Sequence, residues 1–243
     1  MKILALDSSG LVASVAIVDE QQLVAEYTMN HKKTHSQTLV PMLDEVRNMI
    51  ELDLQTIDAI ALAAGPGSFT GLRIGSATAK GLGLALDKPI IPVPTVDALA
   101  YNLYGVEKVI CPLMDARRNQ VYTGLYTFVR NEEKQIYEMQ TIQEQCAVDI
   151  QEILEQMNTL QREVVFLGDG VPVFAQTIAE QLTIPYSFAP ATCNRQRAAC
   201  VAELGKVIFA NGGAQSAAEH APDYLRLSQA EREKQEREQK KEV

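Results

Sequence analysis

The sequence IDAIALAAGPGSFTGLRIGSATAKGLGLALDKPIIPVP (residues 57–94) contains a strand, a helix and a second strand in succession. Residues 57–65 form an apolar run that is typical of a buried strand. Residues 69–86 have the spacing of a helix, and the sequence Asp87-Lys88-Pro89 stops it. Residues 89–94 are apolar again. This order favours an α/β fold.

The residues before this segment predict three strands and one helix. Residues 2–9, 11–20 and 21–29 are short apolar stretches separated by polar turns, as in an antiparallel meander. Residues 35–52 then carry apolar side chains at helical spacing. With a further helix over residues 95–104, the first half has the order β-β-β-α-β-α-β-α. Each half of an actin-like protein is a ribonuclease-H-like lobe with this order.

The second half partly repeats this order, with strands in residues 108–142, a helix over 148–157, a strand, a helix and a longer helix over 194–212. We therefore predict an actin-like (ASKHA) α/β fold with two ribonuclease-H-like lobes, residues 1–104 and 105–228. Residues 229–243 are almost all polar or charged, so we expect a frayed or disordered tail there.

The composition argues against several classes of protein. With 31 acidic and 22 basic residues the net charge is -9, which disfavours strong binding of nucleic acid by the chain alone. The four cysteines form no CxxC pair, so a zinc site is not indicated. The apolar run at the N-terminus is too short for a signal peptide or a membrane span. We expect a cytoplasmic protein without membrane contact.

The glycine-rich turn GPGSFTGLRIG (residues 65–75) is not a nucleotide-binding motif of a known kind. It lacks the lysine of a P-loop, and Thr70 stands where a dinucleotide loop has its third glycine. Instead, small residues recur every four positions at Gly71, Gly75, Ala79 and Gly83. Such a row lets another element approach closely. Its partner is either the sheet of the same chain or another protein.

Two other polar motifs have weaker interpretations. The turn Asp7-Ser8-Ser9-Gly10 could approach Mg²⁺ and phosphate, or it could be a simple hairpin turn. His31 and His35 stand four apart, but Lys32 and Lys33 between them disfavour a metal, and a third ligand is lacking. No motif indicates a catalytic nucleophile.

Several motifs together resemble the TsaB (YeaZ) family and cover nearly the whole chain. They are ILALDSS, HSQTLVPML, GPGSFTGLRIG, AKGLGLAL, DARRNQVYTGLY and PDYLRL. The resemblance implies a non-catalytic partner of TsaD in the synthesis of N6-threonylcarbamoyladenosine at position 37 of tRNA. TsaD carries an H-x-x-x-H metal motif, and Thr95 and Leu99 occupy the matching positions here. These side chains cannot replace two imidazoles, so we expect no metal and no catalytic residue of its own.

The resemblance also implies partners. It predicts a heterodimer with TsaD, a homodimer when alone, assembly with TsaE, and tRNA contact only through the complex. It places the partner interface on residues 35–51 and 70–86, at His35, Leu39, Met42, Gly71, Gly75, Ala79 and Gly83. On this view, Gly75→Leu leaves the fold intact and abolishes association with TsaD.

No cofactor of its own is implied by the resemblance, but ATP or ADP in the assembled complex is, with Asp7 and Ser8 as candidate contacts. The alternative function is a stand-alone actin-like ATPase or small-molecule kinase. That alternative calls for a stronger second phosphate loop than the LGDG sequence around Asp169 provides.

Overall fold

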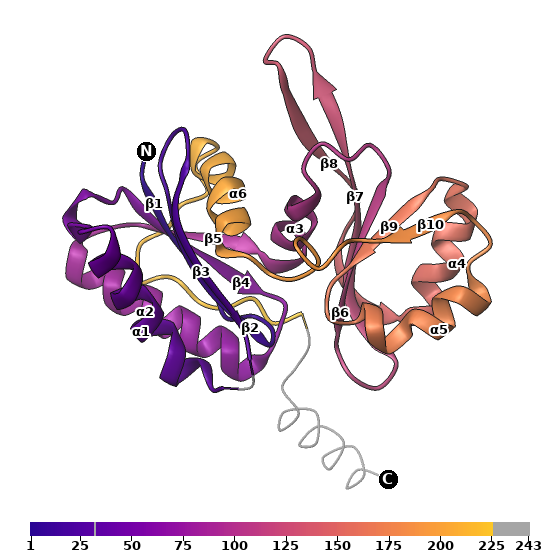
Figure 1. Ribbon diagram of the computed structural model, residues 1–243, viewed down its shortest axis with the longest axis horizontal. Helices are drawn as coiled ribbons and strands as arrows, with labels where there is room; N and C mark the ends of the chain where they lie inside the picture. The colour runs from indigo at the N-terminus through magenta and orange to yellow at the C-terminus, as the bar shows by residue number, and fades with distance from the viewer. Residues whose placement is uncertain (32, 226–243) are drawn as a thin grey trace, which may run out of the picture.

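A computed structural model describes residues 1–31 and 33–225, and Figure 1 shows two lobes side by side. Each lobe contains one five-stranded sheet. All strands of the first sheet precede residue 104, and all strands of the second follow it. The predicted tail, residues 229–243, lies outside the described residues. Among the residues described, no helix is both long enough and apolar enough to cross a membrane.

The first sheet has the strand order β3-β2-β1-β4-β5. β1, β2 and β3 are antiparallel, whereas β4 and β5 run parallel to β1. This is the predicted meander followed by two parallel strands. The strands are β1 (Ile3–Asp7), β2 (Val12–Val18), β3 (Leu23–Asn30), β4 (Ala59–Gly65) and β5 (Ile90–Pro94).

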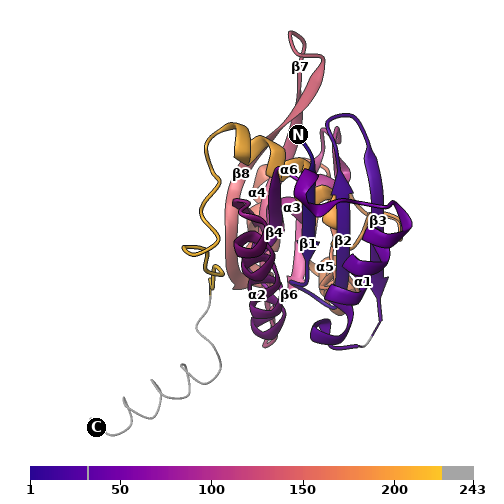
Figure 2. The same cartoon turned by 90° about the vertical axis from the view of Figure 1, so that its left-hand side faces the viewer.

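Helices cover both faces of the first sheet. α1 (His35–Met49) and α2 (Phe69–Leu86) pack side by side on one face, and η1 (Leu54–Thr56) precedes β4 (Figure 2). Along β1, Leu4 and Leu6 belong to this core, whereas Ile3 and Ala5 point to the opposite face. That face is covered by α6 (Ala198–Ala210), the last helix within the described residues. Because both faces are covered, β1 and β4 are completely buried.

The second sheet repeats the same topology, with the order β10-β9-β6-β7-β8. β6, β7 and β8 are antiparallel, and β9 and β10 run parallel to β6. These observations confirm the predicted pair of ribonuclease-H-like lobes. The elements are β6 (Val109–Asp115), β7 (Gln120–Asn131), β8 (Ile136–Asp149), α4 (Ile150–Leu160), β9 (Val164–Leu167), α5 (Val171–Gln181) and β10 (Tyr186–Phe188). β10 is only three residues long and was not predicted from the sequence.

Two helices cross between the lobes. α3 (Thr95–Ala100) and η2 (Tyr101–Leu103) follow the first sheet in the chain but share an apolar core with strands of the second. Conversely, α6 follows the second sheet and packs against the first. A sequence boundary at residue 104 therefore separates the strands but not the helices.

Candidate functional site

A cleft lies where several strands end. Its lining comes from the turns after β1, β4, β6 and β9, and its volume is about 290 Å³. The carboxyl ends of parallel strands meet at one edge of a sheet, and the β1 and β6 hairpin turns face each other across the lobes. The lining residues are Ser9, Gly10, Leu11, Gly67, Ser68, Met114, Asp115, Ala116, Arg117, Tyr122 and Asp169.

Asp7 and Ser8, the predicted nucleotide contacts, do not line this cleft. Asp7 is 2% exposed, and its Oδ1 accepts hydrogen bonds from the backbone N–H of Ser9 (2.9 Å) and the Ser9 hydroxyl (2.6 Å). Burial raises the pKa of Asp7, although the hydrogen bonds from Ser9 oppose the shift. The Ser8 hydroxyl donates to the carbonyl of Gly71 at 2.9 Å. Both side chains are therefore engaged inside the first lobe.

The side chains that do reach the cleft fit a nucleotide phosphate poorly. Asp115 and Asp169 both line it, and Arg117 is paired with Asp115 at 3.0 Å. Burial raises the pKa of Asp169, whose carboxylate accepts from the backbone N–H of Asp115 at 3.2 Å. Carboxylates repel a polyphosphate unless a cation lies between them. Within residues 1–31 and 33–225, no group of three potential metal ligands is present.

The two histidines of the H-x-x-x-H sequence are not arranged as a pair of ligands. His35 is the first residue of α1, and its Nε2 lies 2.8 Å from the carbonyl oxygen of Gly10. Its Nδ1 is buried without a hydrogen-bond partner among the described residues. His31 is exposed before the helix begins. His35 therefore links α1 to the β1–β2 turn.

The row of small residues on α2 faces the interior of its own lobe. A Cβ at Gly71 would collide with the backbone carbonyl of Ser8, and one at Gly75 would lie 2.5 Å from Ser8 Oγ. Ala79 is fully buried, and a Cβ at Gly83 would lie 2.8 Å from Cβ of Ala217. Of the two partners considered from the sequence, the chain itself covers this row.

Two of the three interface residues predicted on α1 are also internal, whereas His35 is half-buried. Leu39 and Met42 are 1% and 3% exposed and pack in the core below α1 and α2. Leu39, Met42 and the small row are therefore covered by the chain itself in this conformation, and their contact with a partner stays a prediction. The reason is physical: a row of small residues indicates close approach, but spacing alone does not say which element approaches.

The outer faces of the same two helices carry exposed apolar side chains. Val40 and Met49 on α1 are 54% and 77% exposed, and Leu84 on α2 is 66% exposed. Gly81 also faces open space, because a Cβ added at this residue would have no neighbouring atom within 4 Å. The sequence signal for this surface was present at residues 40, 81 and 84, which fall outside the buried helical stripes, whereas Met49 continues the buried stripe of α1 and is exposed at the end of the helix.

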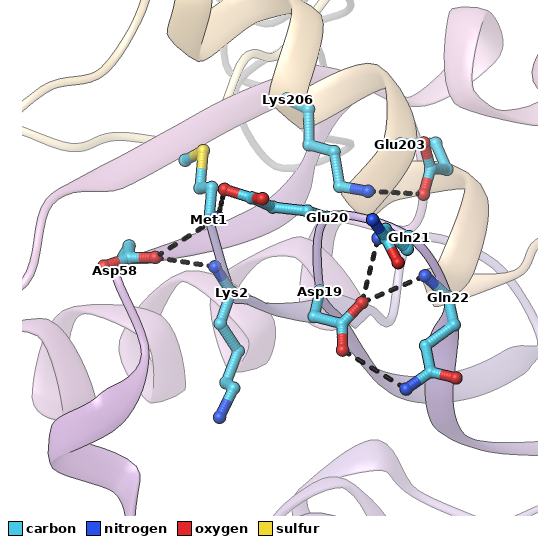
Figure 3. Close-up of polar contacts among 9 residues, drawn as sticks. All are labelled: Met1, Lys2, Asp19, Glu20, Gln21, Gln22, Asp58, Glu203 and Lys206. Carbon is cyan, nitrogen blue, oxygen red and sulfur yellow. Dashed lines mark hydrogen bonds and ion pairs between the residues drawn. The ribbon is translucent and has the colours of Figure 1, made fainter.

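A charged cluster at the β2–β3 turn has a structural explanation (Figure 3). Asp19 accepts hydrogen bonds from the backbone N–H groups of Gln21 and Gln22, both at 2.9 Å, and these bonds lower the pKa of Asp19. The N-terminal amine pairs with Glu20 at 2.6 Å. The cluster closes a hairpin and holds the first residue, so it indicates no ligand.

Thr95 and Leu99 have packing roles at the positions where the resemblance places metal ligands in TsaD. The Thr95 hydroxyl accepts from the backbone N–H of Gly65 at 3.1 Å. Leu99 is 1% exposed in the core between α3 and the second sheet. Thr95 thus ties the start of α3 to β4, and Leu99 packs α3 against the second sheet.

Comparison with known proteins places the chain among tRNA-modification proteins. Residues 22–234 match the family model of TsaD, described as tRNA N6-adenosine threonylcarbamoyltransferase. The chain is 35% identical to the tRNA threonylcarbamoyladenosine biosynthesis protein TsaB of Bacillus subtilis, over 95% of this chain and 96% of that protein. It is 32% identical to TsaB of Haemophilus influenzae, over 93% and 94% of the two chains.

A solved structure agrees with this result. YeaZ from Pseudomonas aeruginosa superposes with a TM-score of 0.76 and 26% sequence identity, covering 92% of this chain and 99% of that chain. The agreement extends over both lobes, as the coverage requires. The chain therefore belongs to the TsaB family.

Proposed function

We propose that the chain is a non-catalytic subunit of the machinery that makes N6-threonylcarbamoyladenosine in tRNA, and that it binds TsaD. The observation that carries this proposal is similarity to TsaB proteins along almost the full length, combined with two non-ligand residues, Thr95 and Leu99, at the positions of the TsaD metal motif. Its role is assembly, and the bond-making step belongs to TsaD.

The exposed apolar face of α1 and α2 supports binding to a protein partner. We define this docking face as Val40, Gly81 and Leu84. Exposed apolar groups gather at protein interfaces, where a small residue such as Gly81 also allows a partner helix to come close. The proposal thus keeps the two helices predicted from the sequence and replaces their buried residues with the outer ones.

Further parts of the proposal follow from the family resemblance. The chain forms a homodimer when TsaD is absent, assembles with TsaE, and meets tRNA only within the complex, in the cytoplasm. Any ATP or ADP binds to the assembled complex, since Asp7 and Ser8 are engaged within the chain. The net charge of -9 agrees with the absence of independent tRNA binding.

The test is co-purification with TsaD of the same organism, followed by titration. Leu84→Arg places a charge at the docking face and is expected to weaken the Kd for TsaD at least about tenfold, which corresponds to roughly 1.4 kcal/mol. Val173→Arg is the matched control, because Val173 is 56% exposed on α5 of the other lobe. The affinity of Val173→Arg for TsaD should equal that of the parent. Both variants should keep the parent's circular dichroism spectrum.

Two outcomes would contradict the proposal at different levels. If the parent chain does not bind TsaD, the proposed function fails. If the parent binds and the two variants bind equally well, the function stands but the docking face is wrong. ATP turnover by the chain alone, unchanged by adding TsaD, would instead favour an independent ATPase.

A further inference from the structure

A second cavity, separate from the cleft, lies at the junction of the lobes. It has a volume of about 550 Å³. One wall is the open end of the β2–β3 hairpin, and the other is the segment after β10 that leads back to α6. The lining residues are Val12, Thr28, Asn30, Ala191, Thr192, Asn194, Arg195, Gln196 and Arg197.

Arg195 brings unused hydrogen-bond donors to this cavity. Its Nη1 donates to the carbonyl oxygens of Gly168 and Asn194, both at 2.8 Å. In the described part of the chain, its Nε and Nη2 have no hydrogen-bond partner and no carboxylate within ion-pair distance. The guanidinium is thus held in place by one nitrogen while its other N–H groups remain available.

Arg197 adds a second guanidinium, which is partly neutralised. Its Nε donates to Glu26 Oε2 at 3.0 Å, and its Nη2 donates to the same oxygen. The other oxygen of Glu26 accepts from the backbone N–H of Ala199 at 3.1 Å. Glu26 is therefore committed to Arg197 and to the start of α6. The Arg197 side chain is still 37% exposed.

Gln196, between the two arginines, has a buried donor without an acceptor. The residue is 2% exposed, and its Nε2 has no hydrogen-bond partner in residues 1–31 or 33–225. Its amide lies directly over Gly10, where a Cβ would be only 2.8 Å from Nε2. A buried N–H group without a partner is destabilising, so an acceptor that reached Gln196 Nε2 would relieve a penalty.

The remaining lining groups suit an oxygen-rich anion. Thr28, Asn30, Thr192 and Asn194 supply hydroxyl and amide groups, and none of the lining residues that the structure describes carries a carboxylate. A cavity lined by two arginines and no described carboxylate is unusual in a chain with a net charge of -9. Guanidinium groups surrounded by neutral donors are the usual means of binding a phosphate, because each of its oxygens accepts several hydrogen bonds.

We propose that this cavity binds a phosphate group, held by Arg195 and Arg197 with the amide of Gln196. The site is distinct from the cleft between the β1 and β6 turns and from the docking face. It does not depend on the proposed function, because the binding groups all belong to this chain. The phosphate can come from a free small molecule or from an RNA backbone.

The test is a titration of the full chain, labelled with ¹⁵N, followed by NMR of the arginine Nε–H and glutamine side-chain signals. Inorganic phosphate is one ligand, and a short single-stranded RNA is the other. Saturable shifts of the Arg195, Gln196 and Arg197 signals are expected with phosphate. If the RNA produces the same shifts at lower concentration and competes with phosphate, the natural source is RNA. If only inorganic phosphate produces them, the source is a small molecule.

Two variants distinguish a specific phosphate-binding site from nonspecific attraction of anions to the protein. Asn30→Asp puts a negative charge on the wall of the cavity at an exposed residue whose side chain has no hydrogen bond in the described structure. It should weaken phosphate binding about tenfold through charge repulsion. Asn211→Asp makes the same change at the exposed end of α6, remote from the lining, and should leave binding unchanged. Absence of saturable shifts with both ligands, or equal weakening in the two variants, would overturn the proposal.

Discussion

The two lobes share one strand order but differ in how their helices meet the sheets. In the first lobe, α2 packs through small residues, so that its backbone lies close to the β1–β2 turn. In the second lobe, the corresponding helix α5 packs through the bulky side chains Phe174 and Ile178. Strand order therefore does not determine how close a helix lies to the sheet that it covers. That distance is set by the size of the side chains in the contact.

The exposed surfaces differ in the same way. α1 and α2 expose Val40, Met49 and Leu84, whereas α4 and α5 have one large exposed apolar side chain, Val173, among the described residues. The second lobe instead extends a long hairpin, β7–β8, beyond the body of the molecule (Figure 1). One topology has therefore been adapted to two different surfaces.

The largest expected effect tests the close packing of α2. Gly71→Ala places a methyl group against the backbone carbonyl of Ser8, which cannot move without disturbing β1. We expect it to lower the free energy of unfolding by about 3 kcal/mol or more, measured by denaturant titration. By the same reasoning, Gly75→Leu should unfold the first lobe, which reverses the expectation drawn from the sequence alone.

Gly81→Ala is the matched control on the same helix. No atom lies within 4 Å of the position where its Cβ would be, so only helix propensity changes. The variant should be more stable by up to about 1 kcal/mol. If the two alanine variants have equal unfolding free energies, close packing does not distinguish the two helix faces, and the comparison between the lobes fails.

A smaller effect is expected where the lobes are joined. The Tyr126 hydroxyl on β7 donates to Asp97 Oδ1 on α3 at 2.6 Å. Burial raises the pKa of Asp97, and the hydrogen bond from Tyr126 opposes that shift. Tyr126→Phe should therefore cost roughly 1–2 kcal/mol of unfolding free energy and raise the pKa of Asp97 further.

Tyr122→Phe provides the comparison on the same strand. The Tyr122 hydroxyl has no hydrogen bond within residues 1–31 and 33–225, and the residue lines the cleft. Removing the Tyr122 hydroxyl should leave the free energy of unfolding nearly unchanged, as measured by thermal or denaturant unfolding. If Tyr122→Phe lowers the free energy of unfolding as much as Tyr126→Phe does, the contact between Tyr126 and Asp97 does not hold the lobes together.

A pH-dependent effect is expected at the buried carboxyl of Asp7. Because burial raises its pKa in the folded state, the folded protein binds the proton more tightly than the unfolded chain. Stability from this group is therefore present below the unfolded pKa and is lost as the pH rises through the folded value. Relative to the parent, Asp7→Asn should become steadily more stable as the pH rises above the usual carboxyl pKa of about 4 toward the raised value in the folded state. A constant difference across this range in urea titrations would contradict the assignment.

The order of strands and helices could be predicted because apolar spacing is a local property. The runs at residues 57–65 and 89–94 and the helical spacing of residues 69–86 correspond to β4, β5 and α2. The short strand β10 was missed because three residues are too few to establish a period. The family was also recognisable from the sequence, since its motifs are contiguous stretches of residues.

Only the tertiary structure decided which faces of these elements meet. The sequence determined that Gly71, Gly75, Ala79 and Gly83 form a row needing a close neighbour, but the neighbour, Ser8, lies 63 residues away from Gly71. The cavity lined by Asn30 and Arg195 joins segments that are farther apart still, and Glu26 and Arg197 are 171 residues apart. Periodicity reports which side of an element is apolar or small. What covers that side depends on how the whole chain packs, because burial is shared between elements that the sequence keeps far apart.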